Sequence, residues 1–183
     1  MEDDVGYRGQ TEFREIQRAL PMLSARLRTA FAVAKRVSPV LVKFEPTVPV
    51  AKALELAWRH ATGEPLDEVV VRNTLDELDD RLDEMRDRGD TDYVMTVLDA
   101  VYHTLVSVLP SQEYDAVGAA FDAAATAAAH GDRRNAESFV EQELAWQLLA
   151  LSVVRACEGQ SATREMFDSV ASAPPWLADL LGD

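Results

Sequence analysis

Apolar residues recur at intervals of three and four along almost the whole chain, and no stretch alternates apolar and polar residues convincingly. This spacing is that of helices with one buried face, so the pattern predicts an all-α protein, a single compact bundle of seven or eight helices. The 183 residues are enough to bury one core, and no linker rich in proline, glycine and serine divides them. We therefore expect one domain over residues 1–183.

Prolines, glycines and capping residues mark where the predicted helices begin and end. Residues 1–20 are expected to form an arm or a short helix capped by Thr11. Pro21 suits the first turn of the next helix, which Pro39 ends. The next helix is predicted over "VAKALELAWRHATG", with Leu54 and Trp58 facing inward. Further helices are predicted over about 65–88, from Asp90 or Thr91 through Leu105, over 110–131 and 135–158, and briefly after Ser161. Residues 174–183 are predicted to be a docking tail.

The predicted helix over about 65–88 is unusually acidic. The segment "LDELDDRLDEMRDRGDTD", residues 75–92, holds nine acids. At 100° per residue, five apolar side chains from Val71 to Met85 fall within an arc of about 80°, which predicts a buried seam. The acids lie on the other faces of the helix. The acidic stripe that we regard as the candidate binding face consists of Asp76, Asp79, Asp80, Asp83, Glu84 and Asp87.

The charges on this helix do not neutralise one another. Six opposite-charge pairs and eight like-charge pairs occur at spacings of three or four, and each is worth roughly 0.2–0.5 kcal/mol. The predicted favourable pairs are Glu68–Arg72, Arg72–Asp76, Glu77–Arg81, Arg81–Glu84, Asp83–Arg86 and Glu84–Arg88. Three interpretations of the stripe stay open: a solvated face, a binding face for a basic partner, and a site for a divalent metal.

The metal interpretation has a chemical basis. Mg²⁺ prefers carboxylate oxygens, and Asp79, Asp80 and Asp83 spell D-D-x-x-D, which resembles the motif of helical prenyl-diphosphate synthases. Those enzymes use two such helices, and this chain has no second copy of the motif. The all-α nucleotide pyrophosphatases, with E-x-x-E pairs on two helices, are closer in size. The nearest counterparts here are Glu137, Glu141 and Glu143.

The net charge of the chain limits which classes of partner it is expected to bind. The net charge is −14, and residues 1–60 are mildly basic, with ten basic and seven acidic residues, whereas the remainder is strongly acidic. Such a field repels nucleic acids and anionic membranes and attracts basic proteins or cations. The acidic N-terminus lacks the apolar core of a secretory signal, and no apolar run is long enough to span a bilayer. We therefore expect no nucleic-acid partner, no membrane partner and a location in the cytoplasm.

Other chemistry-bearing residues form no recognisable constellation. His60, His103 and His130 are far apart without metal-ligand spacing, and Cys157, the only cysteine, is expected to be a buried, inert thiol. No phosphate loop, dinucleotide fingerprint or nucleophile motif occurs. The sequence thus indicates no catalytic residue, no resident metal and no cofactor.

Several segments resemble a known family. "FAVAKRVSPVLVKF" and "ALELAWRHATG", followed later by "LDAVYHTLVSVL" and "AESFVEQELAWQLLAL", are similar to the bacterial domain-of-unknown-function family 416 over about residues 24–168. The resemblance implies a compact helical bundle and brings no assigned activity. The proline-rich "EPTVPV" and the density of aspartates depart from the family pattern. The residues that carry the resemblance are Arg36, Pro39, Phe44, Leu54, Leu56, Trp58, Asp99, Ala100, Leu105, Gln142, Glu143, Trp146 and Leu149.

These observations favour a protein-binding module without enzymatic activity. Its acidic stripe would steer and hold a basic protein partner, as an immunity or antitoxin-like inhibitor does with a basic toxin such as a nuclease. The alternative is a Mg²⁺-dependent all-α phosphohydrolase of a nucleotide or diphosphate, with Asp79, Asp80 and Asp83 as ligands. The sequence does not set the oligomeric state.

Overall fold

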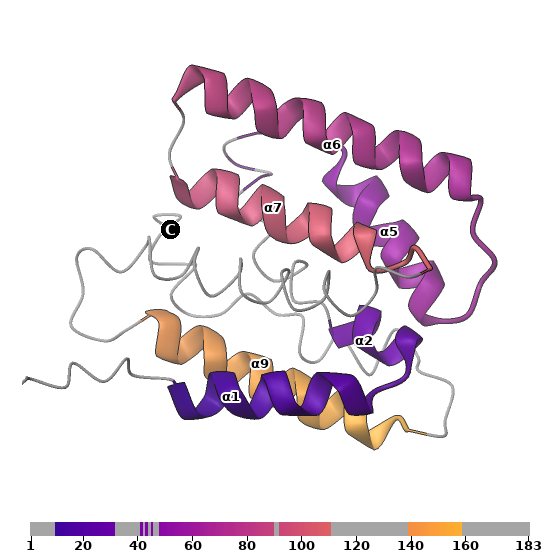
Figure 1. Cartoon of the computed structure of the whole chain (residues 1–183), viewed down its shortest axis with the longest axis vertical. Coiled ribbons are helices and arrows are strands. Elements are labelled where there is room, and N and C mark those ends of the chain that lie inside the picture. Colours follow the sequence, from indigo (N-terminus) through magenta and orange to yellow (C-terminus); the bar gives the residue numbers. More distant parts are fainter. Residues whose placement is uncertain are drawn as a thin grey trace, which may run out of the picture.

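The structure is a computed structural model that describes residues 10–31, 41, 43, 45, 48–89, 92–110 and 139–158. Within these ranges the regular structure is helical and contains no strand, which confirms the all-α class (Figure 1). The predicted total of seven or eight helices includes ranges outside this part of the chain. The elements are α1 (Gln10–Ala19), the 3-10 helix η1 (Leu20–Met22), α2 (Ala25–Phe31), α5 (Val50–Ala61), α6 (Glu68–Arg88), α7 (Asp92–Val106) and α9 (Phe139–Ala156).

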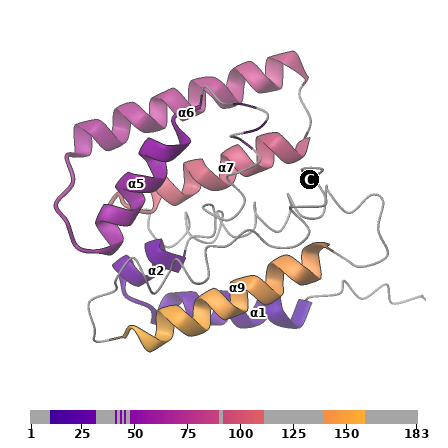
Figure 2. The ribbon, with the colours of Figure 1, turned by 180° about the vertical axis from the view of Figure 1, so that it is seen from behind.

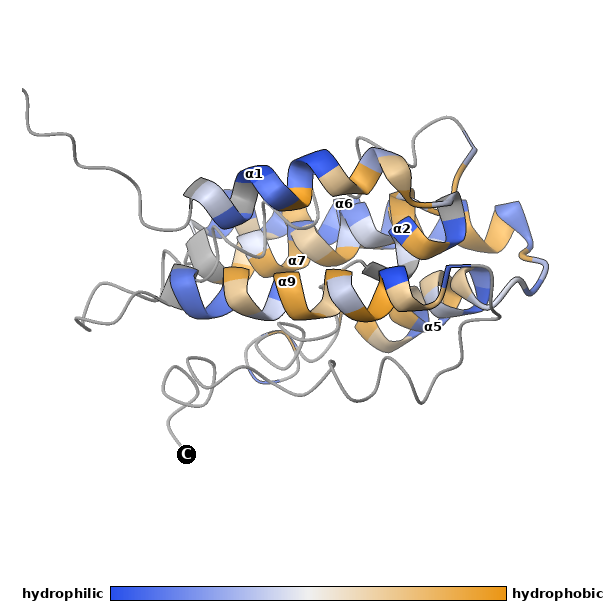
Figure 3. Ribbon diagram, turned by 90° about the horizontal axis from the view of Figure 1, so that it is seen from below, coloured by the Kyte–Doolittle hydropathy of each residue, from blue (hydrophilic) through white to orange (hydrophobic). Residues whose placement is uncertain are grey.

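The described helices lie on two sides of the molecule. α6 runs beside α7 and both contact α5, whereas α1 runs beside α9 on the opposite side (Figures 1 and 2). α2 joins the two sides, because it contacts α5 as well as α9. Figure 3 shows that α1, α2 and α9 each carry both hydrophobic and hydrophilic residues, as expected of helices with one inner face.

One apolar cluster joins the two sides. Its buried side chains come from every described helix and from the single residues Leu41 and Val48. Core packing of this kind usually contributes more to helix stability than intrinsic propensity does. The largest fully buried side chains are Ile16, Leu20, Leu41, Leu78, Met85, Leu98, Leu105 and Leu151.

The acidic helix α6 has clear signals at both ends. Asp67 is its N-cap, and the Asp67 side chain accepts a hydrogen bond of 2.9 Å from the Val69 backbone N–H. Gly89 ends the helix with a φ of 69°, a left-handed conformation that glycine adopts without strain. The helix thus begins three residues after Pro65, and its end at Arg88 agrees with the prediction. The predicted seam is confirmed: Val71, Leu75, Leu78, Leu82 and Met85 are all buried.

The second predicted helix begins later than its sequence indicates. Pro21 lies in η1, after which Leu23 is extended, with a φ of −82° and a ψ of 150°. The Ser24 hydroxyl accepts a 3.4 Å hydrogen bond from the Leu27 backbone N–H, so Ser24 caps α2 at Ala25. The prediction that one helix runs from Pro21 is therefore wrong at its start. The extended turn buries Leu23, and Ser24 then caps a new helix.

The prediction for α5 also needs a correction. The helix ends near Gly63 as expected, with a φ of 84° at that residue. Leu54 and Trp58, which the pattern placed inward, are only partly buried and pack against the edge of the core. α5 contacts α2 and α7, and three of its five buried residues are alanines. The buried residues of α5 are Val50, Ala53, Leu56, Ala57 and Ala61.

Several predictions fall outside the described residues. These are residues 1–9, the end of the second helix at Pro39, the caps Asp90 and Thr91, the helix over 110–131 apart from Pro110, the start of the last helix over 135–138, the short helix after Ser161 and the tail 174–183. Of the two alternatives left open for residues 1–20, the structure shows a helix over Gln10–Ala19, and Thr11, expected as its cap, lies inside that helix. The single domain over residues 1–183 stays a prediction.

Candidate partner-binding face

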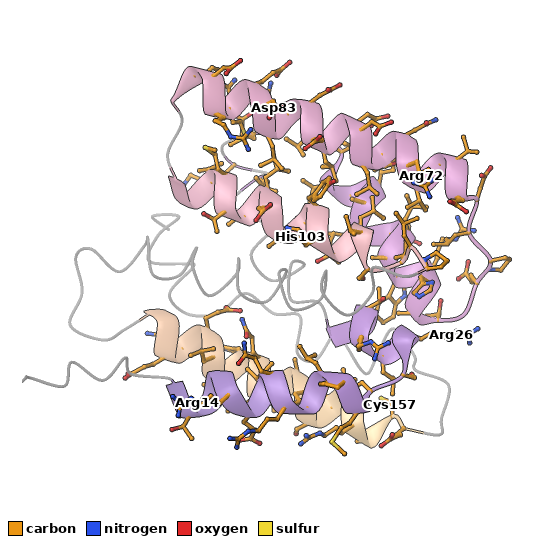
Figure 4. All side chains as sticks on the ribbon, viewed as in Figure 1. Arg14, Arg26, Arg72, Asp83, His103 and Cys157 are labelled. Carbon is orange, nitrogen blue, oxygen red and sulfur yellow. The ribbon has the colours of Figure 1, made fainter. Side chains whose placement is uncertain are left out.

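All six acids of the acidic stripe are exposed. α6 lies at the outer edge of the described helices, and Figure 4 shows Asp83 among the side chains along this helix. The burial of the apolar seam fixes the rotation of α6 about its axis, so the acids point away from the core. The structure therefore presents the stripe to solvent.

With partners among the described residues, two of the six stripe acids form ion pairs. Asp83 Oδ1 lies 2.5 Å from Arg86 Nη1, and Glu84 pairs with Arg81. In the described part of the chain, the other four have no ion-pair partner. These uncompensated acids are Asp76, Asp79, Asp80 and Asp87.

Three of the six ion pairs predicted along α6 are present, namely Glu68–Arg72, Arg81–Glu84 and Asp83–Arg86. Of the remaining three, Arg72–Asp76 is absent because Arg72 pairs with Glu68, and the other two give way to contacts with other segments among the described residues. Glu77 Oε1 lies 3.2 Å from Lys52 Nζ of α5. Arg88 contacts Glu45, which precedes α5 in the chain. Sequence spacing within one helix could not anticipate partners brought in by the fold.

Glu45 binds two arginines of α6 at once. Its Oε1 lies 2.7 Å from Arg88 Nη2, and its Oε2 accepts a hydrogen bond from Arg81 Nη2. The Glu45 side chain is only 13% exposed, and the Arg81 side chain is 23% exposed. Hydrogen bonds from Arg81 to Glu45 and Glu84 raise the pKa of the guanidinium above its ordinary value. Glu45, Arg81, Glu84 and Arg88 thus form a charge network along one flank of α6.

The negative surface continues from α6 onto α7. Burial raises the pKa of the Tyr102 phenol, and the carboxylates of Asp79, Asp76 and Asp99 raise it further. His103 Nε2 lies 3.4 Å from Asp99 Oδ1, one helical turn away, and the rings of Tyr102 and His103 meet edge to face at 5.5 Å. Neither Asp99 nor Tyr102 belongs to the acidic stripe that the spacing along α6 predicts. Only the packing of α6 on α7 brings them beside the stripe.

The described residues provide no metal centre. None of them form a group of three or more histidine, cysteine or acidic side chains placed to hold a metal ion. Among the expected counterparts of the D-D-x-x-D segment, Glu141 is exposed and Glu143 is fully buried, and both lie on α9, across the molecule from α6 (Figure 1). Glu137 lies outside the described residues. In the part that the structure describes, two acidic helices do not face one another.

α9 carries a buried polar pair that the apolar pattern did not indicate. Gln147 Nε2 donates a 3.0 Å hydrogen bond to Glu143 Oε1, and both side chains are fully buried. Leu149, one of the residues that carry the family resemblance, is instead 47% exposed. A polar pair inside and a leucine outside explain why hydrophobicity alone describes the inner face of α9 poorly.

Cys157 is buried at the end of α9, as expected. Its Sγ donates a 3.2 Å hydrogen bond to the carbonyl of Val153, and burial raises the pKa of the thiol. A buried thiol with a raised pKa is a poor nucleophile at neutral pH. Of the histidines, His60 lies on α5 and His103 on α7, and His130 is outside the described residues.

Comparisons with protein-family models, with curated proteins and with solved structures found no match to this chain. The resemblance to the domain-of-unknown-function family 416 stays a prediction for that reason. No helix in the described ranges is both long and apolar enough to cross a membrane.

Proposed function

We propose that this protein is a non-catalytic binding module that holds a basic protein partner on the acidic stripe of α6. The observation that carries the proposal is the set of four exposed aspartates, Asp76, Asp79, Asp80 and Asp87, that have no ion-pair partner among the described residues. An inhibitor of a basic toxin, of the immunity or antitoxin kind, is the form of partner binding that this small acidic chain suits best.

Two physical properties support a basic partner. First, the net charge of −14 produces a field that accelerates the approach of a cationic protein, an effect that falls with ionic strength. Second, the uncompensated aspartates repel one another on one helix, and lysine or arginine side chains of a partner would relieve that repulsion. The face is therefore better suited to cations than an acidic helix whose charges are internally paired.

A charge-reversal variant with a matched control tests the proposal. D80K/D83K/D87K places three lysines on the stripe and replaces one acid of an exposed ion pair, Asp83–Arg86. The control, E15K/E64K/E158K, changes the net charge equally, also at exposed acids, and replaces one acid of the exposed pair Arg59–Glu64.

The measurement is affinity capture from a lysate of the native host, followed by calorimetric titration of any basic protein retained. The wild type and the control variant should retain the same basic protein, and the stripe variant should lose it while melting at an unchanged temperature. Equal retention by all three would refute the proposal. A thermal stabilisation by Mg²⁺ at matched ionic strength, lost in D80N, would instead support the phosphohydrolase alternative.

A further inference from the structure

We draw no further inference here: the strongest candidate, the apolar surface patch of Val69 and Val70 at the start of α6, is exposed, but nothing in the described part of the chain shows what covers it.

Discussion

The guanidinium of Arg26 lies against the Cα of Gly63, the residue that ends the turn after α5. A Cβ at position 63 would lie 2.5 Å from Arg26 Nη1, and the φ of Gly63 is +84°. The left-handed backbone therefore favours glycine here, and any larger residue would also displace the exposed guanidinium of an arginine of α2. The contact also shows how α2 and the turn after α5 come together.

G63A should lower the free energy of unfolding by about 1–2 kcal/mol from the left-handed backbone, and the contact with Arg26 should add little, because its exposed guanidinium can move aside. Denaturant unfolding of the purified protein measures the total. G89A is the matched control, because Gly89 has a φ of +69° and a Cβ there would meet nothing within 4 Å.

The contribution of Arg26 can be isolated with R26A/G63A. Without the guanidinium, alanine at position 63 should cost no more than it does at position 89. If R26A leaves the difference between the two positions unchanged, the contact with Arg26 contributes nothing to the preference for glycine.

Asp67 should stabilise the start of α6 through its side chain. D67A removes the acceptor for the Val69 N–H and a negative charge at the helix N-terminus, so we expect a loss of about 1 kcal/mol in unfolding free energy. D67N keeps an acceptor oxygen and should retain most of the stability. Equal losses in both variants would mean that the charge of Asp67, and not its hydrogen bond, matters.

Self-repulsion on the stripe should appear in stability as well as in binding. Every residue three or four positions from Asp80 on α6 is an acid, namely Asp76, Glu77, Asp83 and Glu84. D80N should therefore raise the unfolding free energy by a few tenths to about 1 kcal/mol at low salt, and the gain should shrink at high salt. The control E15Q on α1, which has Glu12 and Arg18 at these spacings, should change little. A salt-independent gain would contradict the electrostatic explanation.

The pH dependence of stability should contain a contribution from Tyr102. Its pKa is raised in the folded protein by burial and by neighbouring carboxylates, so the folded state binds the phenolic proton more tightly than the unfolded state. The contribution is thus fully present below the ordinary tyrosine pKa of about 10 and is lost as the pH rises through the folded pKa. Unfolding free energies from pH 8 to 11 should fall less steeply in Y102F.

The same tyrosine reports on the acids of the stripe. D76N/D79N should lower the pKa of Tyr102 toward its ordinary value, although burial, the larger cause, remains. Difference absorbance spectra against Y102F measure the titration directly. An unchanged titration in D76N/D79N would place these two carboxylates too far away to influence the phenol.

Apolar periodicity was sufficient to predict the helical class, α5, α6 and α7, and the inner face of α6. The seam from Val71 to Met85 was predictable because a helix repeats every 3.6 residues, so spacing alone places side chains on one face. The exposure of the stripe followed from the same periodicity. The cap at Ser24 could not be predicted in this way. It depends on the extended backbone of Leu23, and the spacing of apolar residues does not indicate that conformation.

What the sequence determined by itself was therefore local: where most described helices lie, which face of α6 is apolar, and that its acids outnumber its bases. Only the tertiary structure decided which charges compensate one another. Glu45 is 36 residues from Arg81, and Lys52 is 25 residues from Glu77. Helical periodicity relates residues three or four positions apart, whereas these pairs depend on how separate segments pack. The same packing set Asp99 and Tyr102 of α7 beside the stripe and gave it four aspartates without a partner among the described residues.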